Sequence, residues 1–228
     1  MSRPIFILAA HADDEALGCG GTIRQHADAG DEVAVLFLTN GVGARTAAGE
    51  AEAQRRAAAM RTALGLLGVQ HHRLLDFPDN RLDQVALLDV VQAVQSFLAG
   101  WQAPAVVYTH HPGDLNIDHQ IAHRAALTCF RPQPGERPSP DIFDFEVPSS
   151  TGWHGVSAAP AFQPNYFRDI TGTLPAKIAA LRAYGEEMRP WPHARSLEGV
   201  EALARMRGCS VGLAAAEAFV VERVIVAS

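Results

Sequence analysis

A regular alternation of short apolar runs with helix-forming segments is the feature that most constrains how this chain can fold. An apolar run of about four to eight residues is typical of a buried strand, whereas apolar residues spaced about three to four apart indicate a helix. The predicted strands are residues 5–10, 32–39, 72–77, 103–110, 141–147 and 218–227. The predicted helices are residues 15–30, 50–68, 84–101, 117–130, 173–188 and 196–208. Because strands that alternate with helices pair in parallel, this pattern predicts an α/β fold.

The predicted architecture is a Rossmann-like three-layer sandwich, in which helices cover both faces of a mostly parallel sheet. With 228 residues, the chain is long enough for one such domain with a sizeable core and short for two. Residues 131–140 hold four prolines, but a strand-like run follows at once, so we interpret them as a surface loop. We therefore expect a single domain over residues 1–228.

Composition and charge argue against several functional classes. The net charge of −6 and the isoelectric point of about 5.9 leave no basic surface for nucleic acid. No apolar run reaches the roughly 18 residues of a membrane span, and the N-terminal run meets a histidine and three acids too soon for an export signal. Cys19, Cys129 and Cys209 are far apart and predict free thiols in a reducing compartment. We expect a soluble, cytoplasmic protein.

Polar residues gather where three of the predicted strands end. The first cluster is His-Ala-Asp-Asp-Glu (11–15), the second is Thr-Asn-Gly (39–41), and the third is THHPGDLNIDH (109–119). The carboxyl ends of parallel strands lie at one edge of a sheet, and ligands bind at that edge in such folds. The three clusters are therefore predicted to converge there.

The first and third clusters contain the donors of a metal site. Catalytic zinc takes about three N or O ligands from the protein and keeps one position for water. His11 and Asp14 flank the turn between a strand and a helix, and His119 in the first turn of a later helix offers a third donor. Asp13 lies next to Asp14 but cannot share its direction, so it suits the base that deprotonates the zinc-bound water.

Helix capping is the alternative for several of these residues. Asp13 or Asp14 would stabilise the start of the first helix through its dipole, and Asn116 would cap the helix that follows it. The GCGG segment at 18–21 is a weak indication of phosphate binding, because it lacks the residue spacing of a nucleotide-binding loop.

Two motifs resemble those of a known family. The segment AHADDEALGCGGTI (10–23) is similar to the opening motif A-H-P-D-D-E-x-x-G-x-G-G of the PIG-L (LmbE-like) zinc-dependent N-acetyl sugar deacetylases. HHPGDLNIDHQ (110–120) resembles the second motif of that family. FPDNRLD (77–83), EEMRPWPHARS (186–196) and AEAFVVERVIV (216–226) resemble further family segments, so the resemblance covers essentially the whole chain.

The resemblance implies one zinc ion per chain, bound by His11, Asp14 and His119. It also implies that Asp13 is the general base and that Asp118 is a supporting carboxylate, which orients a neighbouring imidazole. These ligands and this base are the residues that the chemical argument selects as well.

The sequence departs from the family pattern at two positions. Ala12 replaces the usual proline after the first histidine, which affects the stiffness of the loop more than its chemistry. Asn116 stands where several members carry a histidine that stabilises the oxyanion; an amide can donate a hydrogen bond there but cannot supply a proton. The candidates for protonating the leaving amine are then His193, His110 and His111, or Asp13 returning the proton that it received.

The implied function is a hydrolase that removes an N-acetyl group from an amino sugar or a sugar-containing small molecule and releases acetate. The substrate-binding candidates are Asn40, Arg56, Asp79, Asn80, His110, His111 and Trp153. Two alternatives stay open: an amidase for a thiol-sugar conjugate, and a non-catalytic sugar- or nucleotide-binding protein on the same fold, which the Asn116 replacement favours. The expected partner is a small N-acetylated sugar or glycoconjugate, and self-association into a homo-oligomer is left open.

Overall fold

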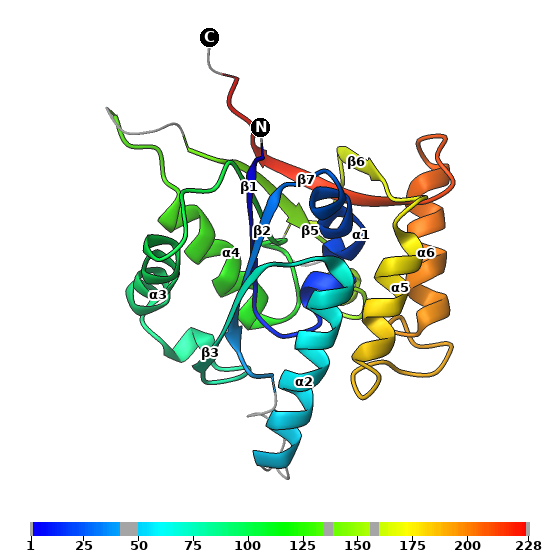
Figure 1. Cartoon of the computed structure of the whole chain (residues 1–228), viewed down its shortest axis with the longest axis horizontal. Coiled ribbons are helices and arrows are strands. Elements are labelled where there is room, and N and C mark those ends of the chain that lie inside the picture. The colour runs from blue at the N-terminus through cyan, green and yellow to red at the C-terminus, as the bar shows by residue number, and fades with distance from the viewer. Residues whose placement is uncertain (1, 42–49, 135–138, 156–159, 227–228) are drawn as a thin grey trace.

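A computed structural model describes residues 2–41, 50–134, 139–155 and 160–226, and these residues form one sheet in the order β3-β2-β1-β4-β5-β7-β6 (Figure 1). The strands are β1 (Pro4–Ala9), β2 (Glu32–Thr39), β3 (His71–Phe77), β4 (Val106–His110), β5 (Asp141–Phe145), β6 (Tyr166–Asp169) and β7 (Ala216–Arg223). Strands β1 to β5 pair in parallel, and β7 is antiparallel to both β5 and β6. The predicted α/β fold with a mostly parallel sheet is confirmed.

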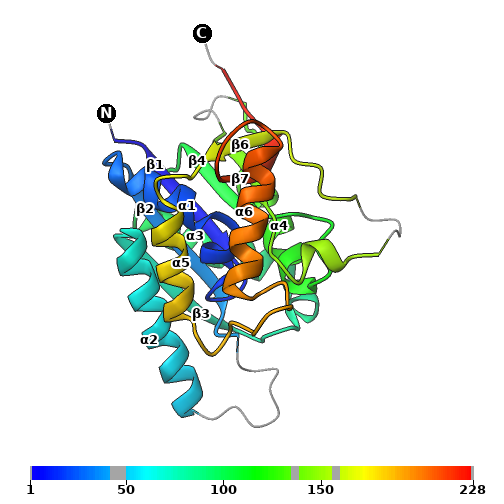
Figure 2. The ribbon, with the colours of Figure 1, turned by 90° about the vertical axis from the view of Figure 1, so that its right-hand side faces the viewer.

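Helices cover both faces of the sheet, as Figures 1 and 2 show. They are α1 (Asp14–Asp28), α2 (Glu50–Leu67), α3 (Leu87–Ala99), α4 (Ile117–Cys129), α5 (Leu174–Ala183) and α6 (Leu197–Cys209). Two short 3-10 turns, η1 (Leu82–Gln84) and η2 (Thr151–Trp153), lie in connecting loops. Helices α1, α2, α5 and α6 share one apolar core with the sheet, and α3 and α4 share a second core on the opposite face.

The central strand β1 shows why its sequence is a continuous apolar run. Ile5 and Ile7 point into the first core, whereas Phe6 and Leu8 point into the second, and all four are fully buried. A strand covered on both faces has no polar positions along its length. The chain can therefore place its polar groups only where the strand ends, at His11.

The sequence prediction differs from the structure mainly in the C-terminal third. It does not predict β6, because the YFRD segment is only partly buried and carries no apolar run. The last strand begins at Ala216, two residues before the predicted start. The helix predicted over 173–188 ends at Ala183, after which a turn brings Glu187 within 2.9 Å of Arg56.

No helix among the described residues is both long and apolar enough to cross a membrane.

Candidate metal centre

Three donor atoms meet at the carboxyl edge of the sheet, where β1 and β4 end. The Nδ1 atom of His11 lies 3.2 Å from Oδ2 of Asp14 and 3.3 Å from Nε2 of His119. The same His119 nitrogen lies 3.3 Å from Oδ2 of Asp14. All three side chains are buried, and the structure thus brings together the three residues that the sequence predicts as ligands.

The donor set fits a zinc ion. Two imidazole nitrogens and a carboxylate form one of the ligand sets of catalytic zinc sites. The second carboxylate oxygen of Asp14, Oδ1, is buried and has no hydrogen-bond partner among the described residues. Burying a carboxylate oxygen costs free energy unless a cation or a hydrogen-bond donor compensates it. Oδ1 of Asp14 can therefore interact with a bound ion.

The electrostatics of the cluster favour a positive charge between the donors. Burial lowers the pKa of His119, but the carboxylates of Asp14 and Asp114 outweigh this and raise it to about 9. Burial acts to raise the pKa of Asp14, yet the neighbouring imidazoles of His119 and His110 hold it well below its usual range. A cation bound here would satisfy the same carboxylate.

Asp118 and Asp79 hold the ring of His11 from behind. The Nε2 atom of His11 lies 3.2 Å from an oxygen of each carboxylate. Asp118 also accepts hydrogen bonds from the backbone N–H of Asn80, at 2.7 Å, and of Leu82, at 3.0 Å, so its own position is fixed. Such carboxylates orient a ligand imidazole and increase its basicity. Asp118 therefore lies where the resemblance implies a supporting carboxylate.

Asp114 supports His119 in the same way, and the sequence argument does not single it out. Its Oδ1 lies 3.1 Å from Nδ1 of His119, and the hydroxyls of Ser150 and Thr151 donate hydrogen bonds to its two oxygens. Burial raises the pKa of Asp114, but the bonds and charge of these partners lower it to about 2. Its place in the 109–119 cluster is the signal that points to it.

Asp13 is buried beside the candidate ligands, and although it occupies the N-cap position of α1, its side chain does not cap the helix. Its φ of 134° lies in the left-handed region, which costs energy for a residue with a Cβ atom and is typical of functional sites. Its side chain makes no capping hydrogen bond; instead, Oδ2 accepts one from Arg195 at 2.9 Å, and Oδ1 lies 3.5 Å from Arg56. Burial raises the pKa of Asp13 above its usual value, and the guanidinium groups of Arg195 and, to a lesser extent, Arg56 offset only part of this rise.

Arg195 is the residue of the 186–196 segment that reaches the site, although the sequence analysis selects His193. The Nδ1 atom of His193 accepts a hydrogen bond from the backbone N–H of Arg195 at 3.0 Å. Its ring packs edge-on against Trp153, with the ring centres 5.4 Å apart. His193 thus supports the loop that presents Arg195, and neither of these contacts places it beside the metal ligands.

Three of the predicted substrate contacts are buried and held by other parts of the chain. His110 has no exposed surface: its ring stacks on His119 with centres 3.9 Å apart, and its Nε2 accepts the N–H of Ala10. His111 is 3% exposed, with Nε2 at 3.1 Å from the carbonyl oxygen of Pro160. Arg56 donates to the carbonyl oxygens of Ala12 and Gly41, so it braces two loops. These contacts give the three side chains bracing roles in this structure, and substrate contact by them stays a prediction.

Burial also bears on the role of His110 as a proton donor. It lowers the pKa of His110, and the positive field of His119 adds to this effect. A neutral imidazole that accepts a backbone N–H and is shielded from solvent is a poor candidate for protonating the amine.

The other predicted substrate contacts lie around the cluster with varied exposure. Asn80 is exposed, Trp153 is 55% exposed, and Asn40 is half-buried with its amide donating to Asp76. Asp79 is buried, with an oxygen 3.2 Å from Nε2 of His11, and so lies beside the candidate metal ligands. Substrate contact by Asn40, Asn80 and Trp153 stays a prediction.

Asn116 caps α4, as the alternative interpretation holds. Its side-chain oxygen accepts the N–H of Asp118 at 2.8 Å, and its amide nitrogen donates to the side chain of Asn80 at 3.3 Å. Hydrogen bonding of this amide to an oxyanion stays a prediction, and it would require the amide to leave Asn80.

Comparison with known proteins agrees with this geometry. Residues 6–130 match the family PIG-L, described as GlcNAc-PI de-N-acetylase. A diacetylchitobiose deacetylase of Thermococcus kodakarensis is 27% identical over 80% of this chain and 69% of that protein. A 1D-myo-inositol 2-acetamido-2-deoxy-alpha-D-glucopyranoside deacetylase of Kineococcus radiotolerans is 37% identical over 82% of this chain and 69% of that protein. The fold is similar to the crystal structure of the conserved protein TT1542 from Thermus thermophilus, with a TM-score of 0.75, 24% identity and coverage of 99% and 97% of the two chains.

Proposed function

The chain belongs to the PIG-L family of de-N-acetylases, and from this membership we propose that it is a zinc-dependent hydrolase that removes the acetyl group of an N-acetylated amino sugar and releases acetate. The observation that carries the proposal is the buried cluster of His11, Asp14 and His119, with the carboxylate of Asp13 at its side. Arg195 lies outside residues 6–130, which match the family, and yet it contacts Asp13 inside that match. This contact between the two parts of the chain supports a single domain over residues 1–228.

The residues of the chain divide the chemistry between them. Zinc held by His11, Asp14 and His119 would polarise the acetyl carbonyl and lower the pKa of a bound water to about 7. Asp13 accepts the proton of the attacking water, and burial raises its pKa, which suits a general base, while the guanidinium groups of Arg195 and Arg56 offset part of that rise. Asp13 then returns the proton to the leaving amine, because burial and the field of His119 lower the pKa of His110, and Nε2 of His111 faces the carbonyl oxygen of Pro160.

The proposed substrate carries an N-acetylated glucosamine unit. Two relatives are named for compounds of this kind, diacetylchitobiose and an inositol 2-acetamido-2-deoxyglucoside. The exposed ring of Trp153 suits stacking on the apolar face of a sugar. The alternative of a non-catalytic binding protein depends on Asn116, which here acts as a helix cap near the three candidate metal ligands.

Acetate release tests the proposal. The purified protein, loaded with one equivalent of zinc, is incubated with N-acetylglucosamine, diacetylchitobiose and a glucosaminyl-inositol acetamide, and acetate and free amine are measured. We expect release from at least one of them and loss of release after dialysis against a chelator. Zinc binding without turnover on any acetylated sugar would contradict the proposal, and turnover only with bulkier acyl groups on a thiol conjugate would favour the amidase alternative.

Replacing Arg195 with glutamine is expected to move the acidic limb of the pH profile of kcat/KM to higher pH. Arg195 lowers the pKa of Asp13, so its removal raises that pKa, and the base is then protonated over a wider range of acidic pH. The variant should therefore lose more activity at about pH 6 than at about pH 8.5. Arg205→Gln is the control, because Arg205 pairs with Glu201 on the exposed side of α6; an equal loss at both pH values in Arg195→Gln would contradict the role.

Replacing Trp153 with alanine is expected to raise KM for the sugar by about 2- to 10-fold and to leave kcat nearly unchanged. The ring is exposed and held edge-on by His193, so it can contribute stacking energy without touching the reacting atoms. Trp191→Ala, which removes an exposed tryptophan from the loop before His193, is the matched control. Equal KM values for wild type and Trp153→Ala would remove Trp153 from the substrate site.

A further inference from the structure

Helix α1 is interrupted in its middle, within the GCGG segment. Cys19 has φ of −143° and ψ of 24°, so the stretch from Asp14 to Asp28 is two helical pieces joined at a break. A break frees backbone N–H groups at the start of the second piece and carbonyl groups at the end of the first. These groups lie in the buried interior, where each needs a partner.

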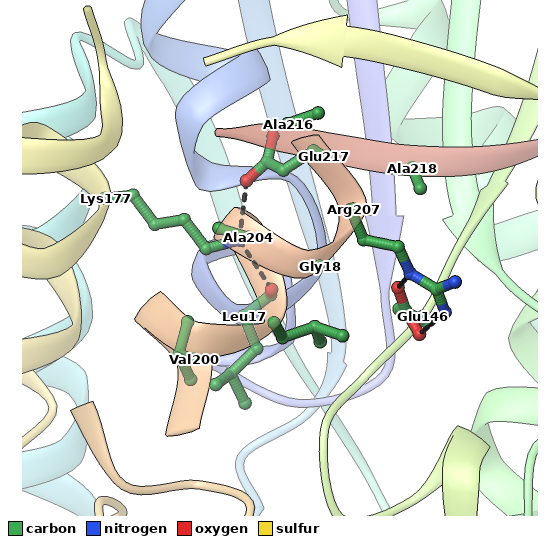
Figure 3. A pocket seen from close by; sticks show the side chains of 11 residues that line it. Leu17, Gly18, Glu146, Lys177, Val200, Ala204, Arg207, Ala216, Glu217 and Ala218 are labelled. Atoms are coloured by element: carbon green, nitrogen blue, oxygen red, sulfur yellow. Dashed lines mark hydrogen bonds and ion pairs between the residues drawn. The ribbon is translucent and has the colours of Figure 1, made fainter. Parts of the chain in front are cut away.

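Lys177 of α5 and Glu217 of β7 supply those partners (Figure 3). Glu217 accepts the N–H of Gly21 at 2.9 Å with one oxygen and the N–H of Thr22 at 2.7 Å with the other. Lys177 donates to the carbonyl oxygen of Leu17 at 2.8 Å and also to Glu217 at 2.6 Å. The pair thus caps both pieces of α1 at once, and we call it the α1 clamp.

The clamp is buried and leaves no room for a ligand. Lys177 is 3% exposed and Glu217 is 4% exposed. The hollow beside them measures about 20 Å³, which holds one water molecule but no phosphate or sugar. The ion pair therefore stabilises α1 through its hydrogen bonds to the backbone of Leu17, Gly21 and Thr22, and not by binding a ligand.

The glycines of the segment allow the break to pack tightly. A Cβ atom on Gly18 would lie 2.2 Å from the ring of Phe145, and one on Gly21 would lie 2.8 Å from Ile170. The GCGG segment therefore serves close packing and the helix break, in place of the phosphate binding that its glycines weakly indicate.

The break is connected directly to the metal centre. The first piece of α1 begins with the ligand Asp14, and Asp13 precedes it in a strained conformation. The ring of Phe145, against which Gly18 packs, lies 4.7 Å from that of His110, which in turn stacks on the ligand His119. The break thus connects to the candidate ligands by two routes, the backbone of α1 and the ring of Phe145.

We propose that the α1 clamp positions Asp13 and Asp14 for zinc binding and catalysis. Lys177 and Glu217 contact the backbone of α1 and are positioning residues. Both come from the part of the chain beyond the family match over residues 6–130, as does Arg195. The inference rests on the proposed zinc-dependent function, because it concerns the geometry of that site.

Two single variants, Lys177→Met and Glu217→Gln, test the clamp. The zinc dissociation constant is measured by competition with a chelator, the ligand geometry by the visible spectrum of the cobalt-substituted protein, and kcat and KM at saturating zinc. We expect the zinc dissociation constant to rise by about 10- to 100-fold, as it does when a residue that orients metal ligands is lost. The cobalt absorption bands should shift, and kcat should fall with little change in KM.

Arg207→Met is the matched control. Arg207 forms an ion pair with Glu146, at 2.7 Å, on the other side of the same hollow, but the pair joins α6 to the end of β5 and not to α1 (Figure 3). We expect this variant to keep the wild-type zinc affinity and cobalt spectrum. A change in the control as large as that in Lys177→Met would overturn the clamp, because loss of packing alone would then explain both.

Removal of one partner leaves a lone buried charge, which can prevent folding. The double variant Lys177→Met/Glu217→Gln removes both charges, and it carries the same expectation because Leu17 still lacks its donor. Unchanged zinc affinity and an unchanged cobalt spectrum in the folded single or double variants would overturn the positioning role of the clamp and leave the proposed function intact. A wild-type protein that binds no zinc would overturn the proposed function, and the clamp with it.

Discussion

An Asp13→Asn variant is expected to lower kcat for acetate release by about 10²- to 10⁴-fold and to keep one zinc ion per chain. Asparagine has nearly the shape of aspartate but cannot accept a proton from the attacking water. It is also a milder change than alanine, because Asp13 accepts a hydrogen bond from Arg195 in a buried setting. The measurements are zinc content by elemental analysis and initial rates of acetate release.

Asp144→Asn is the matched control for that variant. Asp144 is as fully buried as Asp13 and lies on β5, where it approaches His123 at 3.3 Å, outside the cluster of three ligands. We expect it to keep both zinc and turnover. Asp13 would lose its assignment as the base if Asp13→Asn released acetate at the wild-type rate.

A His119→Ala variant is expected to lose bound zinc and to lower kcat/KM by about 10³-fold or more, because the metal contributes several kcal/mol to the transition state. His119 is the proposed ligand from α4, whereas the proposed ligand His11 lies in the turn after β1 and Asp14 begins α1. Without its imidazole the site keeps only two neighbouring donors. Chelation of wild-type protein should give the same loss, and added zinc should reverse it only in the wild type.

His123→Ala is the control on the same helix. His123 lies one turn after His119 and is also buried, but it donates to the carbonyl oxygen of His110 and faces Asp144 and Glu222. We expect this variant to hold one zinc ion and to remain active. The expected single ion would be contradicted if the wild type held two zinc ions per chain and His123→Ala held one. The group of His123, Asp144 and Glu222 would then bind the second ion. Retention of zinc by His119→Ala would remove His119 from the ligand set.

The sequence predicts the candidate ligands because of where they stand relative to the strands. Strands buried on both faces have no polar positions, so polar residues right after them, such as His11 and Asp14, are informative. Parallel pairing then places the ends of β1 and β4 at one edge, which brings His119 to them across 108 residues of sequence.

The residues that support the ligands are harder to choose. Arg195 is one of 19 lysines and arginines, and it reaches Asp13 across 182 positions through a loop whose path the sequence does not predict. Lys177 and Glu217 occur in an ordinary helix and an ordinary strand, and only the break in α1 shows why they are paired. Sequence patterns report local periodicity, and these contacts are not local.

The sequence by itself determined the order of strands and helices except for β6, and which polar clusters follow the strands, because both depend on periodicity along the chain. The tertiary structure alone decided the role of each polar residue within those clusters. His110 and Arg56 resemble substrate contacts in the sequence, but packing buries them as braces, and Asp114, which has no motif of its own, supports His119. Burial and hydrogen-bond partners arise from segments far apart in the chain, so they exist only once the sheet has formed.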